Sequence, residues 1–275
     1  MGDFLIVGIH GIRCYRYLQR TGSPELAAQA LAQEWAAALG TSYESGGFEA
    51  AYYAHHLHLG VSQGEADPEQ LSLSGQEMLM GWVAALGAPA ETTMGPGTLP
   101  VRQAAEWLAR RYGELARRFV VLFCKEADTY VSEPASPRRH QARQELSRVL
   151  ERRRPRVLLA HSLGSVVAYE ALWHDPVELD LLITLGSPLG LPGAVYERLS
   201  LGEGNEKAKG ERPPGVARWI NIADVGDIVA VPRDLSGRFP GIDEHHEVSL
   251  GLVASHKATR YLAAPKVAAT VAPYL

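Results

Sequence analysis

The chain has 275 residues, of which 46% are hydrophobic and 21% charged, and its formal net charge is -4. A chain of this length buries roughly three quarters of its extended surface on folding, so it can form a full core without metal or disulfide staples. The mixed composition excludes coiled coils and low-complexity disorder, and the slightly negative charge argues against nucleic acid binding, which needs an excess of positive charge.

The cysteines and the N-terminus predict a cytoplasmic protein. Cys14 and Cys124 are the two cysteines of the sequence, too few for a disulfide framework or a thiolate zinc site. Residues 1–8 contain an acidic residue and then an apolar run, which is not the pattern of a signal peptide. No apolar stretch approaches ~18 residues, so we expect no membrane span. The sequence leaves the oligomeric state open.

The N-terminal part predicts a strand, a helix and a second strand. Residues 4–9 (FLIVGI) are continuously apolar, as in a strand buried on both faces of a parallel sheet. Ser23 suits the N-cap of a helix that has Pro24 at its first position and ends at Gly40. The second strand is predicted over residues 48–55 (FEAAYYAH).

Residues 60–135 predict a helical segment. Helices are expected over 69–86 and 101–119, separated by the breaker-rich residues 87–100. Residues 119–124 (FVVLFC) could form a strand because of their β-branching, but no turn signal precedes them, and we therefore predict a helix there.

In the last half of the chain, strands alternate with helices. This pattern predicts an α/β fold, a mostly parallel sheet flanked by helices. The expected helices cover 137–154 and 163–173, and the expected strands cover 157–160, 179–185 and 219–223.

A nucleophile elbow is predicted at Ser162, where a strand turns directly into a helix. At such a corner the serine is held in a strained conformation that exposes its hydroxyl, and small residues on both sides let strand and helix approach closely. Ala160 and Gly164 are those small residues. Ser165 lies at the start of the same helix and is expected only to pack.

The serine needs a histidine as its base, and in hydrolases with such an elbow the acid and then the histidine follow it in the chain. His174 lies too close to the elbow helix to reach the serine. His245 and His246, flanked by acidic residues, are expected in a solvated loop. His256 is therefore the predicted base. The carboxylate that orients it should follow a strand, and the last predicted strand is followed by two candidates, Asp224 and Asp227.

Two backbone N–H groups are expected to stabilise the oxyanion of an acyl-transfer reaction. One belongs to Leu163, directly after the serine. The other candidate is Ile12, in the loop after the first strand, where Gly11 permits the turn. His10 in the same loop is interpreted as a structural histidine.

The combined motifs look like the α/β-hydrolase superfamily, in particular its lipase- and esterase-like bacterial serine hydrolases. They are HGI after the first strand, AHSLGS at the elbow, LGSPLG, WINIADVGDIVAVP and SHKATRYL, and they cover residues 1–57 and about 136–270. The resemblance implies one domain over residues 1–275, with 60–135 as a helical cap insertion. It favours Asp227 as the acid, with Asp224 as the alternative, because D-I-V-x-x-P resembles the context of a lipase acid.

The sequence departs from this family in two ways. Ala160 replaces the first glycine of the elbow, and the chain begins at what would be the third strand, so the first antiparallel strands are expected to be missing. Neither departure affects Ser162, Asp227 or His256.

The expected function is therefore a serine hydrolase that cleaves a carboxylic ester or related acyl substrate through an acyl-enzyme on Ser162. An acyltransferase, cyclase or peptidase with the same three residues, or a catalytically silent binding protein of this fold, remains an alternative. The apolar residues of 60–135 predict a largely apolar pocket over Ser162 that suits an apolar or bulky acyl group.

We expect no cofactor and no metal. No glycine-rich phosphate loop is present, which disfavours NAD and ATP. His56 and His58 would lie on one face of the predicted strand, but two imidazoles need a third ligand, and the sequence near them offers none.

Overall fold

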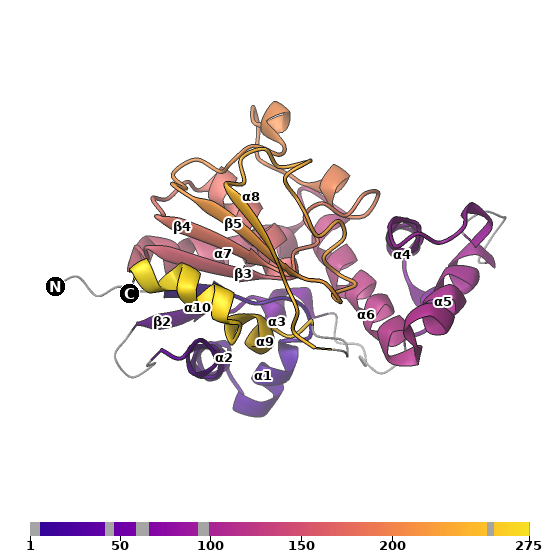
Figure 1. Ribbon diagram of the computed structural model, residues 1–275, viewed down its shortest axis with the longest axis horizontal. Coiled ribbons are helices and arrows are strands. Elements are labelled where there is room, and N and C mark those ends of the chain that lie inside the picture. Colours follow the sequence, from indigo (N-terminus) through magenta and orange to yellow (C-terminus); the bar gives the residue numbers. More distant parts are fainter. Residues whose placement is uncertain (1–5, 42–46, 59–65, 93–98, 252–255, 275) are drawn as a thin grey trace.

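The computed structural model describes residues 6–41, 47–58, 66–92, 99–251 and 256–274. Its centre is a sheet of six strands, all parallel, in the order β2-β1-β3-β4-β5-β6 (Figure 1). The strands are β1 (Ile6–Ile9), β2 (Phe48–Ala51), β3 (Val157–His161), β4 (Leu181–Leu185), β5 (Trp219–Asp224) and β6 (Glu244–Val248). The prediction of an α/β fold with a parallel sheet flanked by helices is confirmed.

The order of the strands places a topological switch point between β1 and β3. The chain runs from β1 outward to β2 and then returns to place β3 on the other side of β1. In open α/β sheets, ligands bind beyond the carboxyl ends of the strands at such a switch point. The loops after β1 and β3, which contain Ile12 and Ser162, therefore meet where a ligand is expected.

Helices cover both faces of the sheet, because the side chains of each buried strand alternate between two cores. Val7 and Leu158 face a core shared with the helices between residues 73 and 174, whereas Ile6 and Leu159 face a core shared with the helices of residues 24–39 and 258–271. The helices on the two faces are α7 (Pro137–Arg153) and α8 (Leu163–His174) on one side and α1 (Tyr15–Thr21), α2 (Pro24–Leu39), α9 (Ala258–Leu262) and α10 (Pro265–Val271) on the other (Figure 1).

Helix α2 has the predicted ends. The side chain of Ser23 accepts a hydrogen bond from the N–H of Leu26 at 3.2 Å, and Pro24 occupies the first helical position. Gly40 ends the helix with φ 78°, a left-handed conformation that glycine adopts without strain.

The segment 60–135 is helical where the structure describes it, and it lies beyond the carboxyl ends of the strands (Figure 1). It contains α4 (Leu73–Ala85), α5 (Leu99–Tyr112) and α6 (Glu114–Val131), with short 3-10 turns at Pro68–Gln70 and Ala90–Thr92. The predicted helix over 119–124 is confirmed as part of α6. Val120, Cys124 and Ala127 are fully buried along one side of this helix.

The structure corrects three predicted segments. The helix predicted over 101–119 is interrupted at Gly113, where φ is 90°, so that α5 ends at Tyr112 and α6 begins at Glu114. The second strand ends at Ala51, and residues 54–57 form the short helix α3 (Ala54–Leu57). His245 and His246 lie in β6 and not in a loop. This strand was missed because EHHEV has no apolar alternation: it lies at the edge of the sheet and is only partly buried.

The remaining regular elements are short 3-10 turns at Tyr196–Arg198, Glu206–Ala208 and Ala272–Tyr274. Among the residues that the structure describes, no helix combines the length and the apolar character needed to cross a membrane.

Candidate functional site

Ser162 lies in the sharp turn between β3 and α8, as predicted. Its φ of 57° and ψ of -132° are unusual for a residue with a side chain, so the surrounding packing must enforce them. A Cβ at Gly164 would lie 2.4 Å from the carbonyl oxygen of His10, and a Cβ at Gly11 would lie 2.4 Å from Cβ of Ser162. The two glycines therefore allow the loops after β1 and β3 to touch.

A chain of hydrogen bonds joins Ser162, His256 and Asp227. Nε2 of His256 is 2.7 Å from Oγ of Ser162, and its Nδ1 is 2.7 Å from Oδ2 of Asp227. Because an ionised carboxylate can only accept, Nδ1 carries the ring proton, and the hydroxyl of Ser162 donates to Nε2. The structure thus brings together the three residues that the sequence had named as nucleophile, base and acid.

The carboxylate of Asp227 is held by two further donors. Oδ1 accepts from the N–H of Val229 at 2.8 Å, and Oδ2 accepts from the hydroxyl of Tyr261 at 2.7 Å. Burial alone would raise the pKa of Asp227, but the charge and hydrogen bond of His256, with the Tyr261 and Val229 donors, outweigh it. The pKa lies below its ordinary value, so the carboxylate beside His256 stays ionised.

Asp224, the alternative candidate for the acid, forms hydrogen bonds with Leu250 and Tyr261. Its Oδ1 accepts a hydrogen bond from the N–H of Leu250 at 2.8 Å, and its own N–H donates to the hydroxyl of Tyr261 at 2.9 Å. These bonds connect the end of β5 to the segment after β6 and to α9. Sequence reasoning had not singled out Tyr261, because nothing local marks a tyrosine whose partners lie 34 and 37 residues away.

The two candidate oxyanion donors border the serine. The N–H of Leu163 is in the first turn of α8, where backbone N–H groups have no acceptor within the helix. Ile12 lines the same pocket as Ser162. The next residue, Arg13, has φ 64°, and its N–H donates to both carboxylate oxygens of Glu126, at 3.1 and 2.9 Å. Helix α6 therefore holds the turn that presents Ile12.

His10 has the structural role that the sequence suggested. Its Nδ1 donates to the carbonyl oxygen of Gly11 at 2.7 Å, its Nε2 accepts from the N–H of Tyr53 at 3.1 Å, and its ring stacks on that of Tyr53. Burial lowers the pKa of His10 to about 4, so the ring is neutral.

Aromatic rings surround His256, and sequence reasoning missed them. The ring of His161 lies 4.7 Å from that of His256, and the rings of Phe119 and Phe123 on α6 lie 5.4 and 6.5 Å away. His161 is buried, which keeps its pKa far below the usual range. It therefore packs against His256 as a neutral ring.

A pocket of about 460 Å³ opens beside Ser162. The prediction of a largely apolar pocket, walled partly by residues 60–135, is wrong for this pocket in its apolar character; among the described lining residues, that segment contributes Phe119. The wall is mixed in character, since α1, α2 and the start of α9 supply polar groups. Its charged residues are Arg13, Arg16, Glu34 and Lys257, and Tyr17, Leu31 and Trp35 also line it.

Ser165 packs, as expected. Its hydroxyl is 2.6 Å from the carbonyl oxygen of Ser162, to which it donates, and 2.6 Å from Oγ of Ser187.

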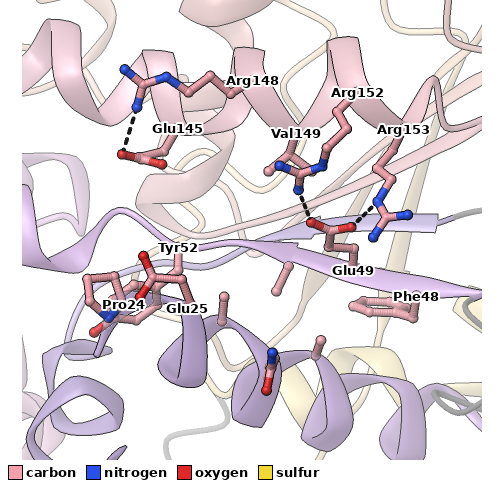
Figure 2. A pocket seen from close by; sticks show the side chains of 14 residues that line it. Pro24, Glu25, Phe48, Glu49, Tyr52, Glu145, Arg148, Val149, Arg152 and Arg153 are labelled. Carbon is pink, nitrogen blue, oxygen red and sulfur yellow. Dashed lines mark hydrogen bonds and ion pairs between the residues drawn. The ribbon is translucent and has the colours of Figure 1, made fainter. Parts of the chain in front are cut away.

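The basic end of α7 faces a second pocket of about 540 Å³ between α2, β2 and α7, where Arg152 and Arg153 both pair with Glu49 (Figure 2).

His56 and His58 do not share one face of a strand, as the sequence had predicted. His56 lies in α3 and binds Glu145 of α7, whereas His58 follows the helix and stacks on Tyr15 with ring centres 3.6 Å apart. The prediction assumed a strand, whose alternate residues share a face, and the helix rotates the two side chains apart.

Comparisons with protein-family models, with curated proteins and with solved structures found no match to this chain.

Proposed function

We propose that the protein is a serine hydrolase of the α/β-hydrolase type, which cleaves a carboxylic ester or a related acyl bond through an acyl-enzyme on Ser162. The observation that carries the proposal is the chain of hydrogen bonds from Asp227 through His256 to Ser162, at a turn with positive φ. Such an arrangement activates a hydroxyl that is otherwise a poor nucleophile.

In the first half of the reaction, Oγ of Ser162 attacks the acyl carbon while Nε2 of His256 takes the hydroxyl proton. The negative charge that develops on the acyl oxygen receives hydrogen bonds from the N–H groups of Leu163 and Ile12. When the intermediate collapses, the bond to the leaving alcohol breaks, and His256 returns its proton to that alcohol. Asp227 remains ionised and stabilises the imidazolium.

In the second half, a water molecule attacks the acyl carbon and gives a proton to His256. The bond between the acyl carbon and Oγ then breaks, the carboxylic acid leaves, and His256 reprotonates Ser162. All of these steps use protein groups and water.

We further propose that α4, α5 and α6 act as the cap of this site within one domain. Two contacts support this role. Nε1 of Trp82 on α4 donates to the carbonyl oxygen of Ile228, next to Asp227, at 2.7 Å, and Phe119 on α6 borders His256 and the pocket. The charged lining of the pocket favours a substrate that has a polar or charged group besides its acyl group.

Labelling with a fluorophosphonate probe, together with hydrolysis of short p-nitrophenyl esters, tests the proposal. We expect the wild type to be labelled and to turn over the esters, and Ser162→Ala to lose both properties while it unfolds at a similar temperature. Ser165→Ala is the matched control and should keep its label. An unlabelled, inactive wild type would indicate a silent binding protein, and a Ser162→Ala variant with more than a few per cent of wild-type turnover would exclude Ser162 as the nucleophile.

A further inference from the structure

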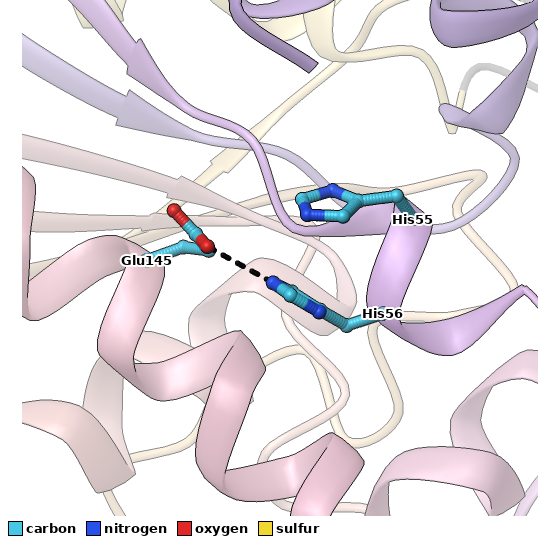
Figure 3. Close-up of side chains that lie close together, drawn as sticks. All are labelled: His55, His56 and Glu145. Atoms are coloured by element: carbon cyan, nitrogen blue, oxygen red, sulfur yellow. Dashed lines mark hydrogen bonds and ion pairs between the residues drawn. The ribbon is translucent and has the colours of Figure 1, made fainter. Parts of the chain in front are cut away.

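A cluster of two histidines and one glutamate lies away from Ser162 and has no part in the proposed reaction. His55 and His56 come from α3, and Glu145 comes from α7, with one nitrogen or oxygen of each within 4.8 Å of the others (Figure 3). Nε2 of His56 is 2.9 Å from Oε1 of Glu145. The structure thus supplies, from 89 residues further along the chain, the third ligand that the sequence around His56 does not offer.

The ring of His55 packs against two other rings but is not fully hydrogen-bonded. It stacks on Tyr52 and lies 3.8 Å from the ring of His56, measured between ring centres. Its Nδ1 is buried and has no hydrogen-bond partner in the described part of the chain. A buried polar nitrogen without a partner is unfavourable, and an ion nearby is one recognised explanation.

We propose that His55, His56 and Glu145 bind a divalent transition metal ion of the zinc class. Two imidazoles and one carboxylate are a known zinc ligand set, which leaves a fourth position for water. Ligand atoms of a tetrahedral zinc site lie about 3.4 Å apart, so rotations of the three partly exposed side chains bring these atoms together. The ion would join α3 to α7. Tyr53, directly before α3, donates its N–H to Nε2 of His10.

A neighbouring cation competes for the same carboxylate. Nη1 of Arg148 is 3.2 Å from Oε1 of Glu145, but the Arg148 side chain is 62% exposed and can turn into solvent. Arg138 acts differently, because it donates to the carbonyl oxygen of His56 at 2.7 Å and fixes the end of α3. Removing Arg148 should therefore strengthen metal binding, an effect that a purely structural ion pair between His56 and Glu145 would not predict.

The test is a Co²⁺ titration of the full chain, free of affinity tag and stripped of metal, followed by visible absorption, with Zn²⁺ added as competitor. We expect one equivalent of Co²⁺ to bind with the absorption of a four- or five-coordinate site, and Zn²⁺ to displace it. His56→Ala and Glu145→Gln should each weaken Co²⁺ binding at least about tenfold. Even the loss of a group that only hydrogen-bonds to a metal ligand lowers metal affinity by about 10–100-fold. Arg148→Ala should tighten it.

Two other histidines, His58 after α3 and His140 on α7, provide matched controls. His58→Ala and the exposed His140→Ala on α7 should bind the ion as the wild type does. Thermal unfolding of the metal-free variants checks folding, and Glu145→Gln, which keeps a hydrogen-bonding group beside His56, remains decisive if His56→Ala is unstable. Absence of stoichiometric binding, equal binding by Glu145→Gln and wild type, or an equal loss in the control variants would overturn the proposal. None of these measurements depends on hydrolase activity.

Discussion

Asp224 and Asp227 are both buried near the end of β5, yet they bind different groups. Asp227 accepts from His256 and Tyr261, whereas Asp224 accepts from the N–H of Leu250. In the proposed hydrolase, one carboxylate therefore orients the base and the other holds a loop.

Mutation separates these two roles. Asp227→Asn should lower kcat by about four orders of magnitude, because an amide cannot fix the Nδ1–H tautomer of His256. Asp224→Asn should leave kcat near the wild-type value and lower the unfolding temperature. Ester turnover and thermal unfolding of both variants are the measurements. Equal kinetic losses, or a larger loss at Asp224, would reverse the assignment.

Glu126 illustrates how one side chain of α6 can affect the loop that contains Ile12. Both of its carboxylate oxygens accept from the N–H of Arg13. Glu126→Ala removes this anchor, and we expect kcat to fall about tenfold, less than the 10²–10³-fold that follows complete loss of an oxyanion donor. Glu126→Gln, which can still accept from Arg13, should retain most activity. A Glu126→Ala enzyme with unchanged kcat would show that the anchor is unnecessary.

The same residue gives a prediction on stability and pH. Burial raises the pKa of Glu126 to about 7 from its ordinary 4.5, so between these values the folded protein binds a proton that the unfolded chain has lost. The contribution of Glu126 to stability is therefore largest at acidic pH and falls as pH rises through this window. Glu126→Gln should raise the unfolding temperature relative to wild type at pH 8 more than at pH 5. A difference independent of pH would contradict the burial argument.

At the scale of elements, a buried ionic network joins α6, α7 and α8. Glu170 of α8 and Arg139 of α7 are fully buried and form an ion pair, and Arg143 lies 3.4 Å from the same carboxylate. The hydroxyl of Tyr130 on α6 and the N–H of Ser200 also donate to Glu170, at 2.8 and 2.9 Å. Glu170 is therefore the acceptor on which four groups depend.

This arrangement predicts an asymmetry between its two main members. Glu170→Leu leaves a buried guanidinium without its carboxylate and should lower the free energy of unfolding by about 3–5 kcal/mol. Arg139→Met should cost less, because Glu170 keeps Arg143 and Tyr130. Urea denaturation measures both, with the exposed Arg148→Met as a control expected to change stability by less than about 1 kcal/mol. A larger loss for Arg139→Met would refute this account of the network.

At the scale of the whole molecule, buried neutral histidines should contribute to acid unfolding. Burial lowers the pKa of His10 to about 4 and that of His161 well below the usual range. As pH falls below about 6.5, the unfolded chain takes up protons that these folded rings resist, so their contribution to stability is lost. The unfolding temperature of His161→Leu should therefore fall less than that of the wild type when the pH is lowered from 7 to 4. Parallel curves for the two proteins would contradict this prediction.

Local patterns in the sequence were enough to predict much of the molecule. Largely apolar segments marked the strands β1 to β5, and Ser23 and Gly40 marked the ends of α2, because propensity and capping act over a few neighbouring residues. The sharp turn at Ser162 was predictable for the same reason, since a strand that turns directly into a helix is a local feature.

Only the tertiary structure decided which distant groups meet. Ser162 and His256 are 94 residues apart. Local sequence could rank the candidate histidines, but it could not show which of them contacts the serine. Tyr261, Glu126 and the ring of His161 became recognisable through contacts with other elements. The mixed lining of the pocket and the cluster of His55, His56 and Glu145 were undetected for the same physical reason. Hydrogen bonds and packing form across the fold, while periodicity reports only which face of one element is buried.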